Sequence, residues 1–239
     1  VFFAAQFFQA IQGFSPLESG LRSLPLTLGS FVASPFAGRI AARYGFRPPV
    51  LAGALSAATG LLLMSNLNPT TSYADLWWKL ALIGLGFGVM ASPLTSAVMN
   101  SAPPARAGLA SSMVNASRQV GAVFGVALLG AVVQRAFAAN LAGRLESAGV
   151  PAAQSAELAT RLAAAGSQAA HVQVSAAGLD PTALRLLVAG SFADALHLAY
   201  LAAGTAVLLI AVMALTLLDR APAVAAVPAM VAKPVCEAA

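Results

Sequence analysis

The chain has 239 residues, of which 59% are hydrophobic and only 9% are charged. Soluble domains carry roughly 25% charged residues, so this composition excludes an ordinary water-facing surface and predicts a chain surrounded by lipid. The net charge is +5, but the basic residues cluster in short loops between apolar runs, which fits orientation in a membrane rather than a nucleic-acid partner.

Residues 1–13 form an apolar stretch that is shorter than the roughly 20 residues a transmembrane helix needs. The stretch has no basic region and no small-residue cleavage site, which argues against a secretory signal. We interpret it as the end of a truncated transmembrane helix, and we therefore expect the sequence to be a C-terminal piece of a longer protein.

Five apolar runs that are long enough to cross a bilayer follow this stretch. We expect helices, because an open sheet cannot satisfy its backbone hydrogen bonds in lipid. The prediction is an all-α polytopic membrane helix bundle, with four transmembrane helices in residues 14–134 and a last one in residues 189–218. The runs cover residues 21–42, 49–67, 76–99, 107–133 and 189–218.

The arginines of the loops predict the orientation of this bundle. Arg39, Arg43 and Arg47 follow the first run without an acidic residue, and Arg106 lies in an equally acid-free loop before the fourth run. By the positive-inside rule we place these loops and the C-terminus in the cytoplasm of a multi-pass protein of the plasma (inner) membrane. Membrane lipid is then the first expected partner.

Two segments lack the composition of membrane spans. Residues 135–188 are too polar, and we expect an extracytoplasmic loop with one or two surface helices that break near residues 149–151 and 179–181. A cysteine placed at Ser167 should then react with a label from outside the cell. Residues 219–239 are rich in Ala, Pro and Val and are expected to form a disordered cytoplasmic tail.

An arginine lies inside the fourth run, where a charge costs about 2.5 kcal/mol or more at a helix centre. Arg118 has Asn115 three residues before it, on the same helix face, and Gln119 directly after it. The functional interpretation is a cationic group that lines a cavity or gates a cytoplasmic mouth, which points toward transport. The alternative is an arginine that snorkels to the inner headgroups. Gly121 and Gly125 form a GxxxG pattern that permits close helix packing.

Asp194 is the only carboxylate near the interior of a predicted span, and His197 follows three residues later. The two side chains can share a helix face, and a protonatable pair within a membrane can carry protons. The alternative is an aspartate at the outer interface, with His197 bonded to a neighbour.

Several residues concern helix geometry rather than chemistry. Pro25, Pro35 and Pro93 are candidates for hinges, although prolines are also tolerated in ordinary membrane helices. The GLGFG segment at residues 84–88 lacks the strand–turn–helix setting of a dinucleotide loop, so we expect it to serve close helix packing. No hydrolase, zincin or Walker pattern is present, so we expect no enzyme, no cofactor and no metal site.

Residues 38–47 (GRIAARYGFR) resemble the cytoplasmic loop motif of the major facilitator superfamily, G-x-x-x-D-R/K-x-G-R/K-R/K. Ala42 stands where the motif has an acid, and Phe46 replaces one basic residue. Residues 9–45 and 115–133 also resemble the fourteen-helix drug:proton antiporter branch. The matching residues are Gly38, Arg43, Gly45 and Arg47 in the loop, and Asn115, Arg118, Gln119, Gly121 and Gly125 in the helix.

This resemblance implies the C-terminal six-helix half of a proton-coupled multidrug efflux transporter that works by alternating access. Its implied partners are a lipophilic, drug-like substrate, protons and the missing N-terminal half, without which the chain is expected not to transport. Because Arg118 has the wrong sign for a cationic drug, it would gate, pair with an acid of the other half, or bind an anionic group. One alternative is an exporter of a specific metabolite, which can be an anionic one. The other is a non-transporting membrane scaffold or remnant that uses residues 135–188 as its interaction surface.

Overall fold

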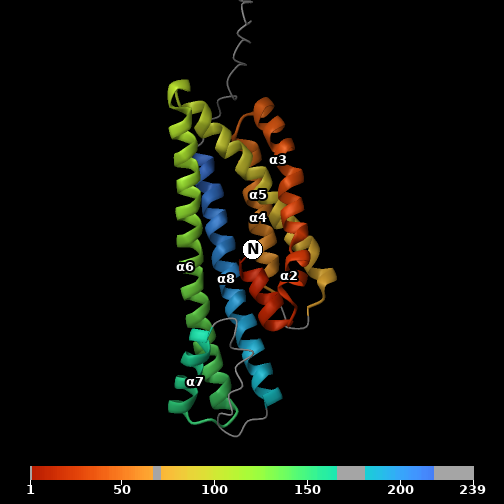
Figure 1. The fold of residues 1–239 in the computed structure, drawn as a ribbon, viewed down its shortest axis with the longest axis vertical. Coiled ribbons are helices and arrows are strands. Elements are labelled where there is room, and N and C mark those ends of the chain that lie inside the picture. The colour runs from red at the N-terminus through yellow and green to blue at the C-terminus, as the bar shows by residue number, and fades with distance from the viewer. Residues whose placement is uncertain (1, 67–70, 166–180, 218–239) are drawn as a thin grey trace, which may run out of the picture.

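The described part of the chain, in a computed structural model, comprises residues 2–66, 71–165 and 181–217. Its regular secondary structure is entirely helical and contains no strand within these ranges, which confirms the predicted all-α class (Figure 1). The elements are α1 (Phe2–Gln6), a π-helical turn η1 (Phe7–Ile11), α2 (Pro16–Arg22), α3 (Leu24–Tyr44), α4 (Arg47–Met64), α5 (Tyr73–Ser101), a 3-10 turn η2 (Pro104–Arg106), α6 (Ala107–Ser147), α7 (Ala152–Ala165) and α8 (Pro181–Leu217).

Four of the described segments are long and apolar enough to cross a membrane: Arg47–Met64, Tyr73–Ser101, Pro104–Ser147 and Ala183–Thr216. They correspond to four of the five predicted runs. The remaining run, residues 21–42, forms α3, which has 21 residues and is therefore long enough, but it is not among the four because Ser30, Ser34 and Arg39 reduce its apolar character. The helix nevertheless lies side by side with α5 in the bundle.

Helix α6 extends well past residue 133, where we expected the fourth span to end. Its 41 residues correspond to about 60 Å, twice the roughly 30 Å of a bilayer core. The helix is therefore too long to lie wholly within a membrane, and part of it projects beyond the lipid. The chain then turns at Gly149, whose φ of 93° suits glycine, and α7 folds back against α6 (Figure 1). Pro181 is the first residue of α8. The predicted label site Ser167 and the tail 219–239 lie outside the described residues.

Glycines of α5 bring three helices into close contact. An added Cβ on Gly84 or Gly88 would overlap backbone atoms of α3, at Leu26 and Ser30 respectively. Gly86, on the other side of α5, would meet the backbone of α4 at Ala57 in the same way. The prediction that the GLGFG segment serves close helix packing is therefore confirmed, because α5 lies wedged between α3 and α4.

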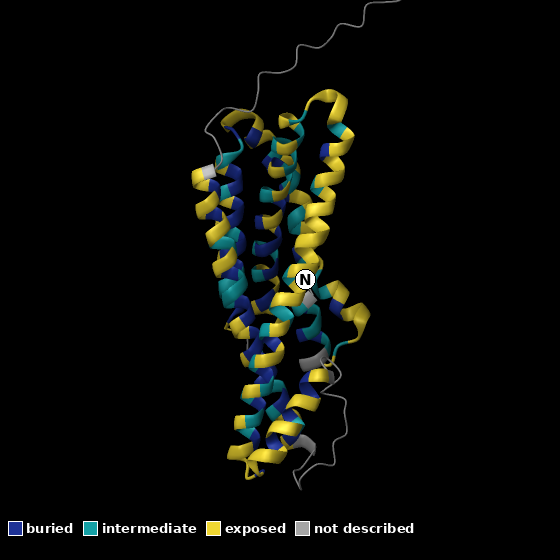
Figure 2. Ribbon diagram, turned by 90° about the vertical axis from the view of Figure 1, so that its left-hand side faces the viewer, coloured by how far each residue is buried: buried dark blue, intermediate teal, exposed yellow. Residues whose placement is uncertain are grey.

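A second packed region joins α6, α7 and α8 at the opposite end from the Arg39–Arg47 loop. The rings of Phe137 and Phe192 meet edge to face, with their centroids 5.8 Å apart, and Leu141, Leu145 and Leu196 are completely buried around them. Figure 2 shows the general pattern, in which buried residues lie where helices meet and exposed residues cover the outside. This packing fixes α6 against α8 and leaves the other half of α6 largely exposed.

The exposed half of α6 contains the predicted GxxxG pattern. No other part of the described chain comes within 4 Å of a Cβ added at Gly121 or Gly125. Within the described residues the two glycines therefore have no helix against them, and their role in close packing stays a prediction.

Candidate functional site

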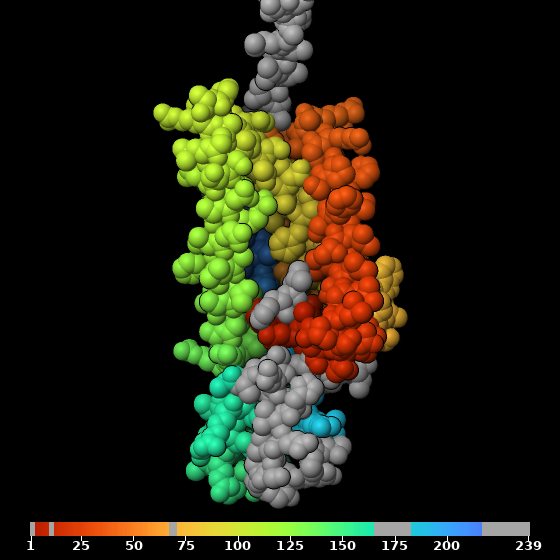
Figure 3. Space-filling view, viewed as in Figure 1, coloured from red at the N-terminus to blue at the C-terminus, as the bar shows by residue number. Residues whose placement is uncertain are grey.

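A groove of about 1250 Å³ lies between α3, α5 and α6. The space-filling view shows the surface hollowed between α6, drawn in green, and α3, drawn in orange, with α5 behind (Figure 3). Large apolar side chains and hydroxyl groups both line its walls. They include Phe31, Phe87, Met90 and Met113, together with Thr27, Ser30, Ser34, Thr95, Ser101 and Ser117.

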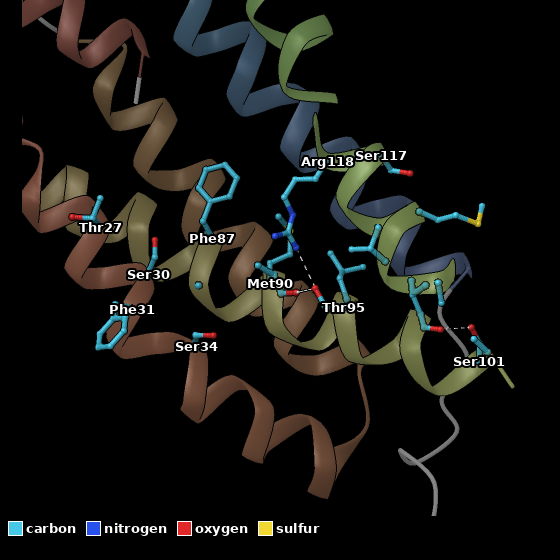
Figure 4. A pocket seen from close by; sticks show the side chains of 18 residues that line it. Thr27, Ser30, Phe31, Ser34, Phe87, Met90, Thr95, Ser101, Ser117 and Arg118 are labelled. Atoms are coloured by element: carbon cyan, nitrogen blue, oxygen red, sulfur yellow. Dashed lines mark hydrogen bonds between the residues drawn. The ribbon is translucent and has the colours of Figure 1, made fainter. Parts of the chain in front are cut away.

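Arg118 is the one charged residue among the described residues that line the groove. Its Nη2 donates a hydrogen bond to Thr95 Oγ1 at 3.2 Å, so it reaches from α6 across to α5 (Figure 4). The Thr95 hydroxyl in turn donates to the carbonyl of Ala91 at 2.9 Å, which directs its free lone pairs away from its own helix. The arginine is thus held on the groove wall by a neutral acceptor.

The two polar neighbours of Arg118 that the sequence singled out do not share this position. Asn115 and Gln119 are both exposed and neither lines the groove. The groove-facing side of α6 is formed instead by Ala110, Met113, Val114, Ser117 and Arg118. These residues occupy positions i, i+3, i+4, i+7 and i+8 of one helix face, and that periodicity is the signal that could have identified Ser117 from the sequence.

A hydroxyl series on α3 was also missed. Thr27, Ser30 and Ser34 are three and four residues apart and all line the groove. Ser30 Oγ reaches the carbonyl of Gly84 on α5 at 3.0 Å, so one of these hydroxyls also ties the two helices together. The spacing places them on one face of a helix, and this regularity was visible in the sequence.

The residues of the loop motif have structural contacts at one end of the bundle. Gly45 ends α3 with φ 85°, a conformation that favours glycine, and Arg43 lies over the ring of Tyr44 at 5.5 Å. Arg47 donates from Nη2 to the carbonyl of Leu215 near the C-terminal end of α8. The helix dipole stabilises a positive charge at that end. The fourth matching residue, Gly38, lines a smaller cavity of about 310 Å³ between α3 and α5.

Asp194 and His197 contact different groups. Asp194 Oδ2 accepts a hydrogen bond from Arg144 Nη2 at 2.6 Å, and the arginine side chain passes directly over Gly190 to reach it. Nδ1 of His197 lies 2.7 Å from the carbonyl oxygen of Ser65 on the neighbouring α4 segment. Arg144 belongs to the extension of α6 beyond residue 133, so sequence reasoning that ended the helix there could not pair it with Asp194.

Replacement of Asp194 by asparagine is expected to leave substantial activity in the full-length protein. About half of its side chain is exposed, and an exposed ion pair contributes no more than about 1 kcal/mol. The measurement is transport activity and thermal stability of Asp194→Asn beside Arg144→Gln, which removes the same pair from the other side. Complete loss of proton coupling in Asp194→Asn alone would instead make the carboxylate a proton carrier.

The three prolines occupy unequal positions. Pro25 lies in the first turn of α3, where a missing N–H breaks no helical hydrogen bond. Pro35 lies inside α3 and Pro93 inside α5, where it is buried, and both helices continue past them. A hinge at either of the two inner prolines stays a prediction.

The fold and the groove define a polytopic helical membrane protein with an amphipathic internal wall. Residues 1–126 match the model of the Major Facilitator Superfamily, so the chain belongs to that superfamily, as the loop motif and the α6 sequence predicted. The match covers α1 through the first half of α6, which includes all three walls of the groove.

Several curated proteins are similar in sequence to this chain. It is 35% identical over 143 residues to the multidrug resistance protein Stp of Mycobacterium tuberculosis, covering 60% of this chain and 26% of that protein. It is 38% identical over 144 residues to the puromycin resistance protein pur8 of Streptomyces alboniger, covering 59% and 29%. It is 30% identical over 217 residues to the tetracenomycin C resistance and export protein of Streptomyces glaucescens, covering 90% and 40%. The chain thus spans well under half the length of these relatives.

Proposed function

We propose that the chain forms the C-terminal six-helix half of a multidrug exporter of the fourteen-helix branch, which exchanges drug for protons by alternating access. The observation that carries the proposal is the groove itself. It is large, its rings and thioethers offer loosely specified apolar contact, and its hydroxyls offer polar contact that many molecules can use. The drug-resistance names of the relatives support the same conclusion. Membership of a transporter superfamily argues against an enzyme.

The proposal is tested with the full-length protein in bacteria that lack their own drug exporters. Puromycin and tetracenomycin C, which appear in the names of two relatives, serve as probes. We expect cells that express the protein to accumulate less of at least one probe, and Ser117→Trp, which fills the groove, to abolish the difference. Ser111→Trp is the matched control, because Ser111 is exposed on the same helix outside the groove. Equal accumulation with and without the protein would count against export.

We also propose an inner-membrane location with the Arg39–Arg47 loop and the C-terminus in the cytoplasm. At that end of the bundle the described residues carry Arg39, Arg43, Arg47 and Arg106 and no acid. The positive-inside rule assigns such an end to the cytoplasm.

A cysteine at Ala156, an exposed position of α7, tests this orientation. In intact cells we expect an impermeant maleimide to label Ala156→Cys, since α7 lies at the end of the bundle opposite the arginines (Figure 1). The native Cys236, the only cysteine of the chain, provides the control and should react only after the membrane is permeabilised. The reverse pattern of labelling would invert the topology.

A further inference from the structure

We infer that the groove selects hydroxylated aromatic acids, with Arg118 as the residue that recognises the acidic group. This inference rests on the proposed export function and narrows its substrate class. It contrasts with the lipophilic, often cationic compounds that the family resemblance implies, and it follows from the charge, the hydroxyl groups and the rings that line the groove.

The positive charge of Arg118 is not neutralised by any described acid. Its guanidinium donates to the neutral Thr95 hydroxyl, whereas the described carboxylates of Asp194 and Glu157 pair with arginines elsewhere. A guanidinium has five N–H donors, and a planar anion such as a carboxylate or sulfonate can accept two of them side by side. The same positive charge repels a cationic drug.

Four of the six hydroxyl groups that line the groove already use their proton within the protein. Each of four donates its proton to a backbone carbonyl of α3 or α5, at distances of 2.8–3.1 Å. The oxygens of Thr27, Ser30 and Ser101 therefore remain to accept from a bound molecule, whereas that of Thr95 already accepts from Arg118 and has one lone pair left. Phenolic O–H groups on the substrate satisfy this arrangement without adding positive charge. The four hydroxyls belong to Thr27, Ser30, Thr95 and Ser101.

Two aromatic side chains also form part of the groove wall. Phe31 on α3 and Phe87 on α5 both line the groove, and 80% of Phe31 is exposed although its ring is apolar (Figure 4). Rings at such a wall favour stacking or edge contact with a planar aromatic body. A substrate that carries its acid toward Arg118 would place its rings against these side chains and its hydroxyls against α3 and α5.

The test uses three probes that share one ring system and one phenol and differ in a single substituent, which is anionic, neutral or cationic. These are 6-hydroxynaphthalene-2-sulfonate, the corresponding neutral sulfonamide, and (6-hydroxy-2-naphthyl)trimethylammonium. Their energy-dependent accumulation is measured in inverted membrane vesicles that contain the full-length protein, and the signal from vesicles without the protein is subtracted. We expect the sulfonate to accumulate at least about tenfold more than the trimethylammonium compound, the ratio that one charge-assisted hydrogen bond supplies.

Arg118→Gln is expected to lower accumulation of the sulfonate at least about tenfold and to leave that of the sulfonamide within about twofold, since only the charged contact is lost. Arg118→Lys, which keeps the charge, should retain an intermediate activity for the sulfonate. If the anion and the cation were transported equally, and Arg118→Gln changed neither, the substrate class would be overturned and drug export would stand. An equal loss of all three probes would make Arg118 a gate. No accumulation of any probe by folded protein would overturn export as well.

Discussion

Gly84→Ala is expected to destabilise the full-length protein by about 3 kcal/mol, even though the helix propensity of alanine is better than that of glycine by about 1 kcal/mol. The added methyl group would overlap the backbone oxygen of Leu26 on α3. A backbone atom cannot rotate aside as a flexible side chain can, so α3 and α5 must separate along a contact that forms one wall of the groove. The measurement is the thermal unfolding of detergent-solubilised protein, with its amount in the membrane.

Gly143→Ala is the matched control for this substitution. Gly143 also lies within a helix, but nothing in the described chain comes within 4 Å of a Cβ added there. Its replacement should be neutral or stabilising by up to about 1 kcal/mol, because only the gain in helix propensity remains. If both variants unfolded at the temperature of the unchanged protein, α3 and α5 would not be packed as closely as described.

Arg118→Ala is expected to abolish export of an acidic aromatic substrate while the amount of protein in the membrane stays normal. Removal of a charge from a membrane helix does not impair insertion, since the charge itself is unfavourable there. A hydrogen bond to a charged group contributes about 1.5–3 kcal/mol, so its loss lowers transport at least about tenfold. Wild-type transport by this variant would reduce Arg118 to an anchor that snorkels to the headgroups.

Thr95→Val provides a graded comparison with Arg118→Ala. Valine keeps the shape of threonine but removes the oxygen that accepts from Arg118 Nη2. One lost neutral acceptor costs about 1 kcal/mol, so we expect export of the same substrate to fall by about threefold to tenfold rather than disappear. A loss as complete as that of Arg118→Ala would mean that Thr95 itself is indispensable for binding.

Sequence patterns of short range predicted much of the fold. Apolar runs located the long helices, and the alternating glycines of residues 84–88 predicted the close packing around α5. Superfamily membership followed from two local motifs and is confirmed by the family match. Such features depend on neighbouring residues of one helix, so they are visible before any helix is placed against another.

Features that depend on the relative placement of helices were harder to predict. The polar composition of residues 135–188 suggested the end of a membrane span, but a helix does not end where lipid ends, and α6 continues to Ser147. The Arg144–Asp194 pair joins residues that are 50 positions apart and was therefore invisible. Asn115 was singled out because it lies three residues before Arg118, whereas the groove is formed by the face that carries Ser117.

The central claim is that this bundle belongs to an exporter that couples drug movement to protons. The most direct test is proton movement in energised inverted vesicles that contain the full-length protein, followed with an internal pH dye as an aromatic drug is added. We expect substrate-dependent release of protons from the vesicles, and loss of that release in Ser117→Trp. No release from protein that is shown to be folded and inserted would contradict proton-coupled export.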